Sequence, residues 1–426
     1  MRWISVAVVV ALISCGGGGG GGGGDPAPEC SVSGKNQFVY EVMKDSYLWY
    51  DSVPDVDYTV YSSPDQLLDV LRYPLDHWSY IESKAAFDQY YEEGRYLGMG
   101  FSLKFDASQN LWVAFVFEDS PAAVFGFERT DQIISINDRP VSEFHDMTAV
   151  WNELYRYTSA DILKRADDHT VQTITIAYDN VNIDTVLHKE IFTVGTTNVG
   201  YLVFESFIEQ SSSELDTVFA EFKAANIEEL ILDLRYNGGG RMSVAQHLAG
   251  LIGGSVTEHG VFQEYRHNEN YSDYDDTLLF TNPPNSLGLD VVYVLSTGDT
   301  CSASESIING LNPFIDVILI GDTTCGKPVG MYVKEICDMV LLPIQFRNLN
   351  AHGTTDYFDG FSPIHSVDDD LRNAFGDPDE DMLEMALYHI EHGGFPPVIT
   401  HATPFRKSDV RRKNELHGLR REIGAF

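Results

Sequence analysis

The sequence predicts an α/β core preceded by a β-rich domain and a small helical N-terminal region. Apolar side chains recur at helical spacing in residues 36–93, and short alternating strands fill residues 94–190. In residues 191–395 strands and helices alternate, which is typical of an α/β domain. With 426 residues, of which 43% are hydrophobic, the chain can form more than one core.

Residues 1–14 predict a lipoprotein signal peptide, which takes no part in the fold. Arg2 precedes an apolar run at residues 3–13 that is too short to span a bilayer. The run ends in the letters LISC, which resemble a bacterial lipobox. This resemblance implies cleavage before Cys15 and lipidation of that cysteine. An ordinary cleaved signal peptide is the alternative.

Residues 15–35 predict a flexible tether, because the unbroken glycine run at residues 16–24 has no side chains for a core. A glycine directly after Cys15 resembles the lipoproteins that Gram-negative cells send to their outer membrane. We therefore expect a lipid-anchored protein of the bacterial cell envelope, at the outer membrane and facing the periplasm.

The formal charge of −36 argues against nucleic acid, or an anionic membrane surface, as a partner for the folded part of the chain. Basic residues gather in the C-terminal tail, residues 396–426, which can pack on the acidic body or remain mobile. The membrane is expected as a partner through the N-terminal lipid anchor.

The β-rich region resembles a PDZ domain. The letters SPAA at residues 120–123 and the run at residues 131–137 match a typical PDZ segment, and residues 98–101 stand at the position of its carboxylate-binding loop. The resemblance implies that backbone N–H groups of this loop bind the terminal carboxylate of a peptide. A glycine-rich turn without a ligand is the alternative. The loop residues are Gly98, Met99, Gly100 and Phe101.

In the α/β region, chemically distinctive motifs follow predicted strands, where α/β sites usually form. Ser302 begins the letters SASE at a strand-to-helix junction, and Lys327 lies in a Gly-Lys turn after the next strand. A serine hydroxyl needs a neighbouring base to become a nucleophile, and a desolvated lysine can be that base. Taken alone, Ser302 could simply cap its helix through the Ser-x-x-Glu pattern, and Lys327 could be a solvated surface residue.

The letters DLRYNGGG at residues 233–240 complete a pattern that resembles the carboxy-terminal processing, or tail-specific, serine proteases. The resemblance implies a crotonase/ClpP-like core, Ser302 as nucleophile and Lys327 as general base, with no metal or organic cofactor. Backbone N–H groups of Ala303, Gly238 and Gly239 would form the oxyanion hole. For Lys327 to act near pH 7, its pKa has to lie about 3 below its ordinary value of roughly 10.4, and burial is the usual cause.

One position departs from that family pattern. Many members carry a glutamine where this chain has Met331, so the third catalytic residue is open. A simple Ser-Lys dyad, or orientation of the lysine by another group such as Glu305, is expected instead.

Four cysteines remain if Cys15 is lipidated, and an exported protein can form disulfides. Four cysteines allow three pairings, and we favour Cys325–Cys337 because these two flank a predicted β-hairpin. A buried or bridged thiol is expected for Cys301, not a nucleophile. A metal at His389 and His392, or a base at His352, finds little support in the sequence.

These observations favour a serine endopeptidase whose PDZ domain recognises protein or peptide substrates with free apolar C-termini. A catalytically silent peptide-binding envelope protein of the same fold is the alternative, favoured by Met331. A third hypothesis, an esterase for small acyl substrates, would not need the β-rich domain.

Overall fold

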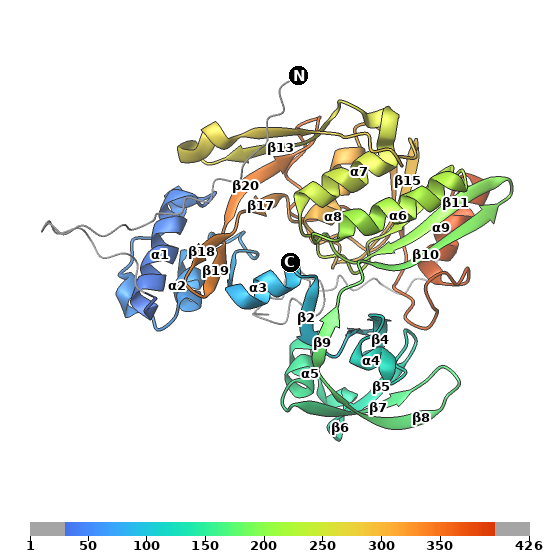
Figure 1. Ribbon diagram of the computed structural model, residues 1–426, viewed down its shortest axis with the longest axis horizontal. Coiled ribbons are helices and arrows are strands. Elements are labelled where there is room, and N and C mark those ends of the chain that lie inside the picture. Colours follow the sequence, from blue (N-terminus) through green and yellow to red (C-terminus); the bar gives the residue numbers. More distant parts are fainter. Residues whose placement is uncertain (1–29, 397–426) are drawn as a thin grey trace, which may run out of the picture.

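The computed structural model describes residues 30–396 (Figure 1). The predicted signal peptide, Cys15, most of the tether and the basic tail after residue 396 lie outside the described residues. Between residues 30 and 396, no helix is long and apolar enough to cross a membrane. The first helix begins at Val32, so the last residues of the predicted tether are helical.

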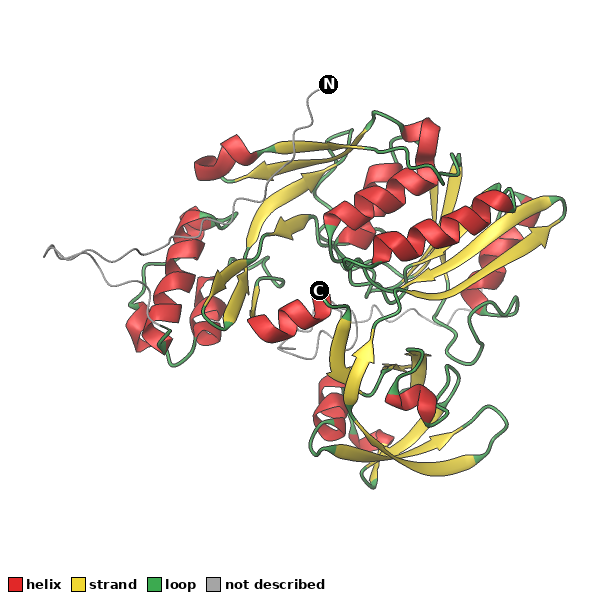
Figure 2. Ribbon diagram, in the orientation of Figure 1, coloured by secondary structure: helices red, strands yellow, loops and turns green. Residues whose placement is uncertain are grey.

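Helices are interspersed among runs of strands along the described residues (Figure 2). The helices are α1 (Val32–Asp45), α2 (Pro64–Leu71), α3 (Lys84–Tyr91), α4 (Pro121–Val124), α5 (Met147–Leu154), α6 (Ser211–Ala224), α7 (Met242–Thr257), α8 (Ala303–Leu311) and α9 (Asp381–His392). The strands up to residue 182 are β1 (Tyr80–Ser83), β2 (Arg95–Gly98), β3 (Phe101–Phe105), β4 (Leu111–Val116), β5 (Gln132–Ile136), β6 (Arg139–Pro140), β7 (Ser159–Arg165), β8 (Val171–Ala177) and β9 (Asp179–Asn182). The later strands are β10 (Val186–Val194), β11 (Thr197–Phe204), β12 (Glu229–Asp233), β13 (Val261–His267), β14 (Asp276–Leu279), β15 (Val291–Ser296), β16 (Asp316–Gly321), β17 (Val329–Met331), β18 (Lys334–Ile336), β19 (Met339–Leu342), β20 (Ile344–Leu349) and β21 (His365–Ser366).

The predicted α/β core is confirmed. Its main sheet has the order β10-β11-β12-β15-β16-β21, in which β10 is antiparallel to β11 and the other neighbours are parallel. Helices α6, α7 and α8 cover one face, and α9 covers the other. Because both faces are covered, the central strands are apolar along nearly their whole length. Leu232 and Val294 face one helical layer, while Ile231 and Leu295 face the other.

The carboxyl ends of three parallel strands bring the distinctive motifs to one edge of this sheet. Asp233 at the end of β12 pairs in register with Leu295 of β15, and Ser296 pairs with Gly321 of β16. The glycine turn follows β12, the Ser302 turn follows β15, and the Lys327 turn follows β16. Neighbouring parallel strands therefore carry all three turns to the same place.

The β-rich domain is inserted between α3 and the main sheet, and lies below the core in Figure 1. Its sheet has the order β3-β4-β5-β7-β8, with β6 paired to β5. Trp151 of α5 is fully buried against this sheet, as is Ala122 of α4. The ribbon β2–β9 closes the insertion, so the chain leaves and re-enters the core side by side.

The N-terminal helices share their hydrophobic core with a later part of the chain. Val39 and Leu67 are buried in one cluster with Val329, Leu341 and Ile344. Residues 80–83, expected within the helical region, form β1 and pair with β19 instead. Tertiary pairing overrides local helical pattern here.

The predicted Cys325–Cys337 disulfide is wrong. The structure has Cys30–Cys337 and Cys301–Cys325 disulfides. The hairpin near these cysteines is β18–β19, and Cys337 lies at its turn, where it is bonded to Cys30, two residues before the start of α1. Cys325 precedes β17, which pairs with β20, so it does not flank that hairpin.

Candidate active site

Ser302 is held in a backbone conformation that side chains rarely adopt. It is the N-cap of α8, with φ of 57° and ψ of −111°. It is also partly exposed, whereas its neighbours Cys301 and Ala303 are buried. Non-glycine residues keep such a conformation only where the surroundings enforce it, and they are concentrated at functional sites. An ordinary N-cap serine has an extended backbone, so capping alone does not explain this residue.

The glycine turn packs directly against Ser302. A Cβ atom added to Gly239 would lie 2.7 Å from the Ser302 Cβ and 2.9 Å from the Ala303 nitrogen. Gly239 also has a φ of 106°, which glycine adopts readily. No side chain fits between this turn and the start of α8.

Asn237 organises the turn, a role that the sequence did not reveal. Its side-chain Nδ2 donates to the Phe204 carbonyl at 2.9 Å, and its Oδ1 accepts from Gly239 N–H and Ser304 Oγ, each at 2.9 Å. Its carbonyl accepts from Cys301 N–H at 3.1 Å. The asparagine thereby fixes the glycine turn to β11 and to α8 at once.

These bonds correct part of the predicted oxyanion hole. The Gly239 N–H donates to Asn237 and is therefore engaged within the protein. Ala303 is the first residue of α8, where a backbone N–H has no acceptor inside the helix. Gly238 is buried in the same turn. Ala303 and Gly238 remain the candidate donors, while Gly239 contributes its small size.

Glu305 joins the serine turn to the lysine turn. Its Oε2 accepts the backbone N–H of Ser302 at 3.0 Å and that of Lys327 at 2.8 Å. Its Oε1 accepts from Thr324 Oγ1 at 2.6 Å and from Gly326 N–H at 2.7 Å. One carboxylate thus brings the two predicted catalytic segments together. Burial raises the pKa of Glu305, and the hydrogen bonds it accepts oppose that rise.

Lys327 is buried, with 2% of its surface exposed. Burial favours the neutral form of an amine, which a general base requires. Met331, at the position of the expected glutamine, packs against the cluster shared with the N-terminal helices. Its side chain therefore belongs to the hydrophobic core.

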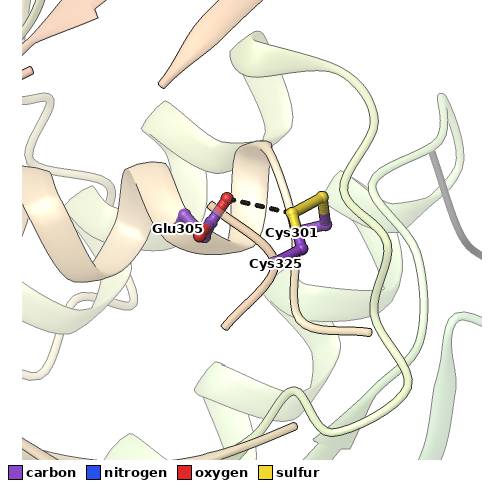
Figure 3. Close-up of side chains that lie close together, drawn as sticks. All are labelled: Cys301, Glu305 and Cys325. Carbon is purple, nitrogen blue, oxygen red and sulfur yellow. Dashed lines mark hydrogen bonds between the residues drawn. A yellow bond between two sulfur atoms is a disulfide. The ribbon is translucent and has the colours of Figure 1, made fainter. Parts of the chain in front are cut away.

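The Cys301–Cys325 disulfide lies beside this carboxylate (Figure 3). Its Cα atoms are 5.2 Å apart, and Cys325 N–H also donates to the Thr300 carbonyl at 3.0 Å. The Cys325 sulfur approaches Glu305 Oε2 to 3.3 Å. That sulfur carries no proton in a disulfide, so the approach is a contact. Bonded to each other, the two sulfurs are not thiolate ligands, and this cluster offers no metal site.

The predicted carboxylate loop is tightly built against the start of α4. Ala122 N–H donates to the Met99 carbonyl and Phe117 N–H to the Gly100 carbonyl, each at 2.8 Å. A Cβ atom on Gly100 would lie 2.1 Å from the Ser120 Cβ. The loop leads into β3, the edge strand of its sheet, and α5 contacts this strand. An extended peptide could add to such an edge.

Two cationic side chains connect the β-rich domain to the site. Lys104 of β3 forms an ion pair with Asp299, in the turn that leads to Ser302. Arg129 donates to Tyr236 Oη at 2.7 Å and pairs with Asp369 at 3.2 Å. Tyr236 immediately precedes Asn237, so both contacts end next to the predicted catalytic motifs. Sequence reasoning found neither, because they join residues far apart in the chain.

A buried network of ion pairs lies directly before the glycine turn in the chain and fixes the end of β12. Arg235 bonds to Asp233 at 2.9 Å and to Glu380 at 2.6 Å, and all three side chains are almost fully buried. Glu380 also caps α9 by accepting from Leu383 N–H. Asp233 and Arg235 of the motif therefore connect the end of β12 to the start of α9 through Glu380.

The weaker histidine candidates stay apart from this site. His389 contacts the Tyr293 hydroxyl at 3.2 Å, and His392 stacks on Tyr388. His352 is exposed in a turn. In the described part of the chain, no group of three metal-binding side chains includes any of them.

Comparison with known proteins agrees with the geometry. Residues 198–357 match the model of Peptidase family S41, and residues 34–80 match that of the Peptidase S41 N-terminal domain. A probable CtpA-like serine protease of Staphylococcus epidermidis is 22% identical over 342 residues, covering 78% of this chain and 65% of that protein. The carboxy-terminal processing protease CtpA of Bacillus subtilis is 25% identical over 307 residues, covering 70% and 61%. This chain thus spans less than two thirds of the length of these relatives.

A crystal structure from Bacteroides fragilis, of a candidate S41 protease, superposes with a TM-score of 0.68 at 25% identity. The match covers 84% of this chain and 97% of that one. The two matched segments, these relatives and the superposed fold show that the chain is similar to peptidase family S41 and to carboxy-terminal processing proteases.

Proposed function

We propose that this protein is a serine endopeptidase that uses Ser302 as nucleophile and Lys327 as general base. The single observation that carries this assignment is the Glu305 carboxylate, which holds the backbone N–H groups of both residues on one oxygen. The constrained backbone of Ser302 and the burial of Lys327 are in accord with these roles.

The proposed reaction needs only groups of this chain. The Lys327 amine takes the proton of the Ser302 hydroxyl as its oxygen attacks the scissile carbonyl, and then gives that proton to the leaving amine. N–H groups of Ala303 and Gly238 stabilise the oxyanion, and each such donor is worth about 3 kcal/mol. Water then hydrolyses the acyl-serine, with Lys327 again acting as the base.

The β-rich domain serves in this proposal as a PDZ domain that binds the free C-terminus of the substrate. The tight loop at residues 98–101 and the open edge of β3 support this role. Specificity for apolar C-termini and attachment to the outer membrane through a lipidated Cys15 are parts of the same proposal. They rest on the PDZ and lipobox resemblances.

A catalytically silent peptide-binding protein is the second candidate, and Met331 favours it. Ser302→Ala and Lys327→Ala separate the two functions, with Lys189→Ala as the control because Lys189 is exposed on β10. Cleavage is measured on peptides with a free or an amidated apolar C-terminus. We expect each catalytic variant to lose more than about 10³-fold in kcat, and the control to keep its rate. Undiminished cleavage by either catalytic variant would refute the dyad.

Loss of cleavage with the amidated peptide would support recognition of the terminal carboxylate. If cleavage of small esters persisted after removal of residues 95–182, the molecule would instead be an esterase. If the unaltered protein bound peptide without Ser302-dependent turnover, the silent binding protein would be the correct assignment.

A further inference from the structure

The Cys301–Cys325 disulfide lies at a position where a covalent bond can control the proposed chemistry. Cys301 directly precedes Ser302, and Cys325 lies two residues before Lys327. The bond therefore joins the serine turn to the lysine turn, and Figure 3 shows it beside Glu305. The second disulfide, Cys30–Cys337, joins the segment before α1 to the turn between β18 and β19 and involves neither the serine turn nor the lysine turn.

Hydrogen bonds also join the two turns, and several of them converge on the Glu305 side chain. Glu305 accepts from Ser302 and Lys327, and Cys325 N–H donates to the Thr300 carbonyl. No glutamine follows the lysine, because Met331 occupies that position in the hydrophobic core. The disulfide adds a covalent link between the serine turn and the lysine turn to these hydrogen bonds.

We infer that the Cys301–Cys325 disulfide is a positioning device for the Ser302–Lys327 pair, and that its reduction switches the proposed peptidase to a slow form. Cys301 and Cys325 are positioning residues, because they act on Ser302 and Lys327 through the backbone of the two turns and not on the substrate. The inference rests on the proposed function and extends it to the control of the site by thiol–disulfide exchange.

The chemical step is balanced by a dithiol reductant. Its thiolate attacks one sulfur of the bond, a mixed disulfide forms, and its second thiol closes the reductant into a disulfide. Two electrons and two protons pass to the protein, and Cys301 and Cys325 become thiols. Partial exposure of Cys325 gives the reductant access to one of the two sulfurs. A disulfide oxidant such as oxidised glutathione restores the bond by the reverse exchange, in which the oxidant is reduced to two thiols.

The test compares two matched double variants of the full chain, Cys301→Ser/Cys325→Ser and Cys30→Ser/Cys337→Ser. The first disulfide closes a separation of 24 residues and the second a separation of 307. Loop-closure entropy therefore predicts that the second pair contributes at least as much to stability. A purely structural role would make the second variant the more impaired of the two.

We measure kcat, KM and the pH–rate profile of each protein with and without dithiothreitol, and count free thiols. We expect Cys301→Ser/Cys325→Ser to lose at least about tenfold in kcat with KM within about twofold. The ascending, acidic limb of its profile should move to higher pH, because a general base that meets water loses its proton only at higher pH. The Cys30→Ser/Cys337→Ser protein should keep the wild-type kcat and lose it when reduced.

Wild-type kcat and pH profile in Cys301→Ser/Cys325→Ser would overturn the inference, as would an equal loss in both variants. If that variant fails to fold, reduction and reoxidation of the wild-type chain decide instead. The inference is supported if kcat falls as free thiols form and recovers as they are reoxidised. It is overturned if kcat does not change with the number of free thiols. If the oxidised wild-type protein showed no Ser302-dependent cleavage, the proposed function itself would be overturned. This result differs from active cleavage that does not respond to reduction, which would overturn only the inference about the disulfide.

Discussion

At the scale of single residues, two buried carboxylates, Glu305 in the candidate site and Glu205 of the core domain, have opposite environments. Glu305 accepts three backbone N–H groups and the Thr324 hydroxyl, so the protein satisfies its charge although it is fully buried. Glu205, also buried, differs. Its Oε2 has no hydrogen-bond partner within the described residues, and burial raises its pKa to about 8, with a further rise from Glu214.

The contrast predicts a pH effect on stability. Folded Glu205 keeps a proton that the unfolded chain releases above its ordinary pKa of 4.5, so the free energy of unfolding falls between about pH 5 and pH 8. Each pKa unit is worth about 1.4 kcal/mol, so Glu205→Gln should be the more stable protein by a few kcal/mol above pH 8. Denaturant unfolding at pH 5, 7 and 9 measures the difference. A constant difference between the proteins across this range would show that Glu205 does not hold the proton.

At the scale of elements, the glycine turn is required by the approach of the strand end to α8. Gly239→Ala would push a methyl group against Ser302 and Ala303. We expect kcat to fall by about 10²-fold, because an error of about 1 Å at a catalytic group costs this much. Gly353→Ala is the matched control, since its φ of 75° is also positive but no atom lies within 4 Å of the added methyl. Equal losses in both variants would assign the effect to backbone strain alone.

The sequence predicted the elements whose pattern is local. The strands after residue 199 and the helices α6, α7 and α9 follow from apolar periodicity, and motif order identified Ser302 and Lys327 as candidates. Residues 80–83 were misread as helical because their partner strand, β19, lies far along the chain. The disulfides were misassigned for the same reason, since pairing depends on tertiary distance.

The candidate site was only partly predictable. Glu305 could be suspected from the SASE letters, because Ser-x-x-Glu places a carboxylate over the first turn of the helix. The same letters could not show that it also binds the N–H of Lys327. Asn237 and Glu380 were missed, because a side chain that organises a turn or caps a distant helix leaves no local signal.

At the scale of the whole molecule, Arg129 couples the β-rich domain to the core. Arg129 is 8% exposed, and its guanidinium bonds to Tyr236, to Asp369 and to the carbonyls of Asp370 and Asn373. Removing one partner from a buried ion pair costs about 3–5 kcal/mol. The contact therefore holds the two domains together beside the glycine turn.

Arg129→Met should release this coupling. We expect faster hydrogen exchange in the segment at residues 366–375 and in the ribbon formed by β2 and β9, together with lower thermal stability. Arg165→Met is the control, because Arg165 is exposed and donates to Gln132 inside the β-rich domain. Unchanged exchange in Arg129→Met would mean that the interface does not depend on this residue.

The most direct measurement of the central claim is covalent labelling with a serine-directed phosphonate, followed by peptide mapping. We expect one label per chain, on Ser302. In Lys327→Ala the labelling rate should fall by more than about 10²-fold, because an unassisted serine hydroxyl is a weak nucleophile. A Ser302 that stays unlabelled, or that reacts equally fast without Lys327, would contradict the central claim.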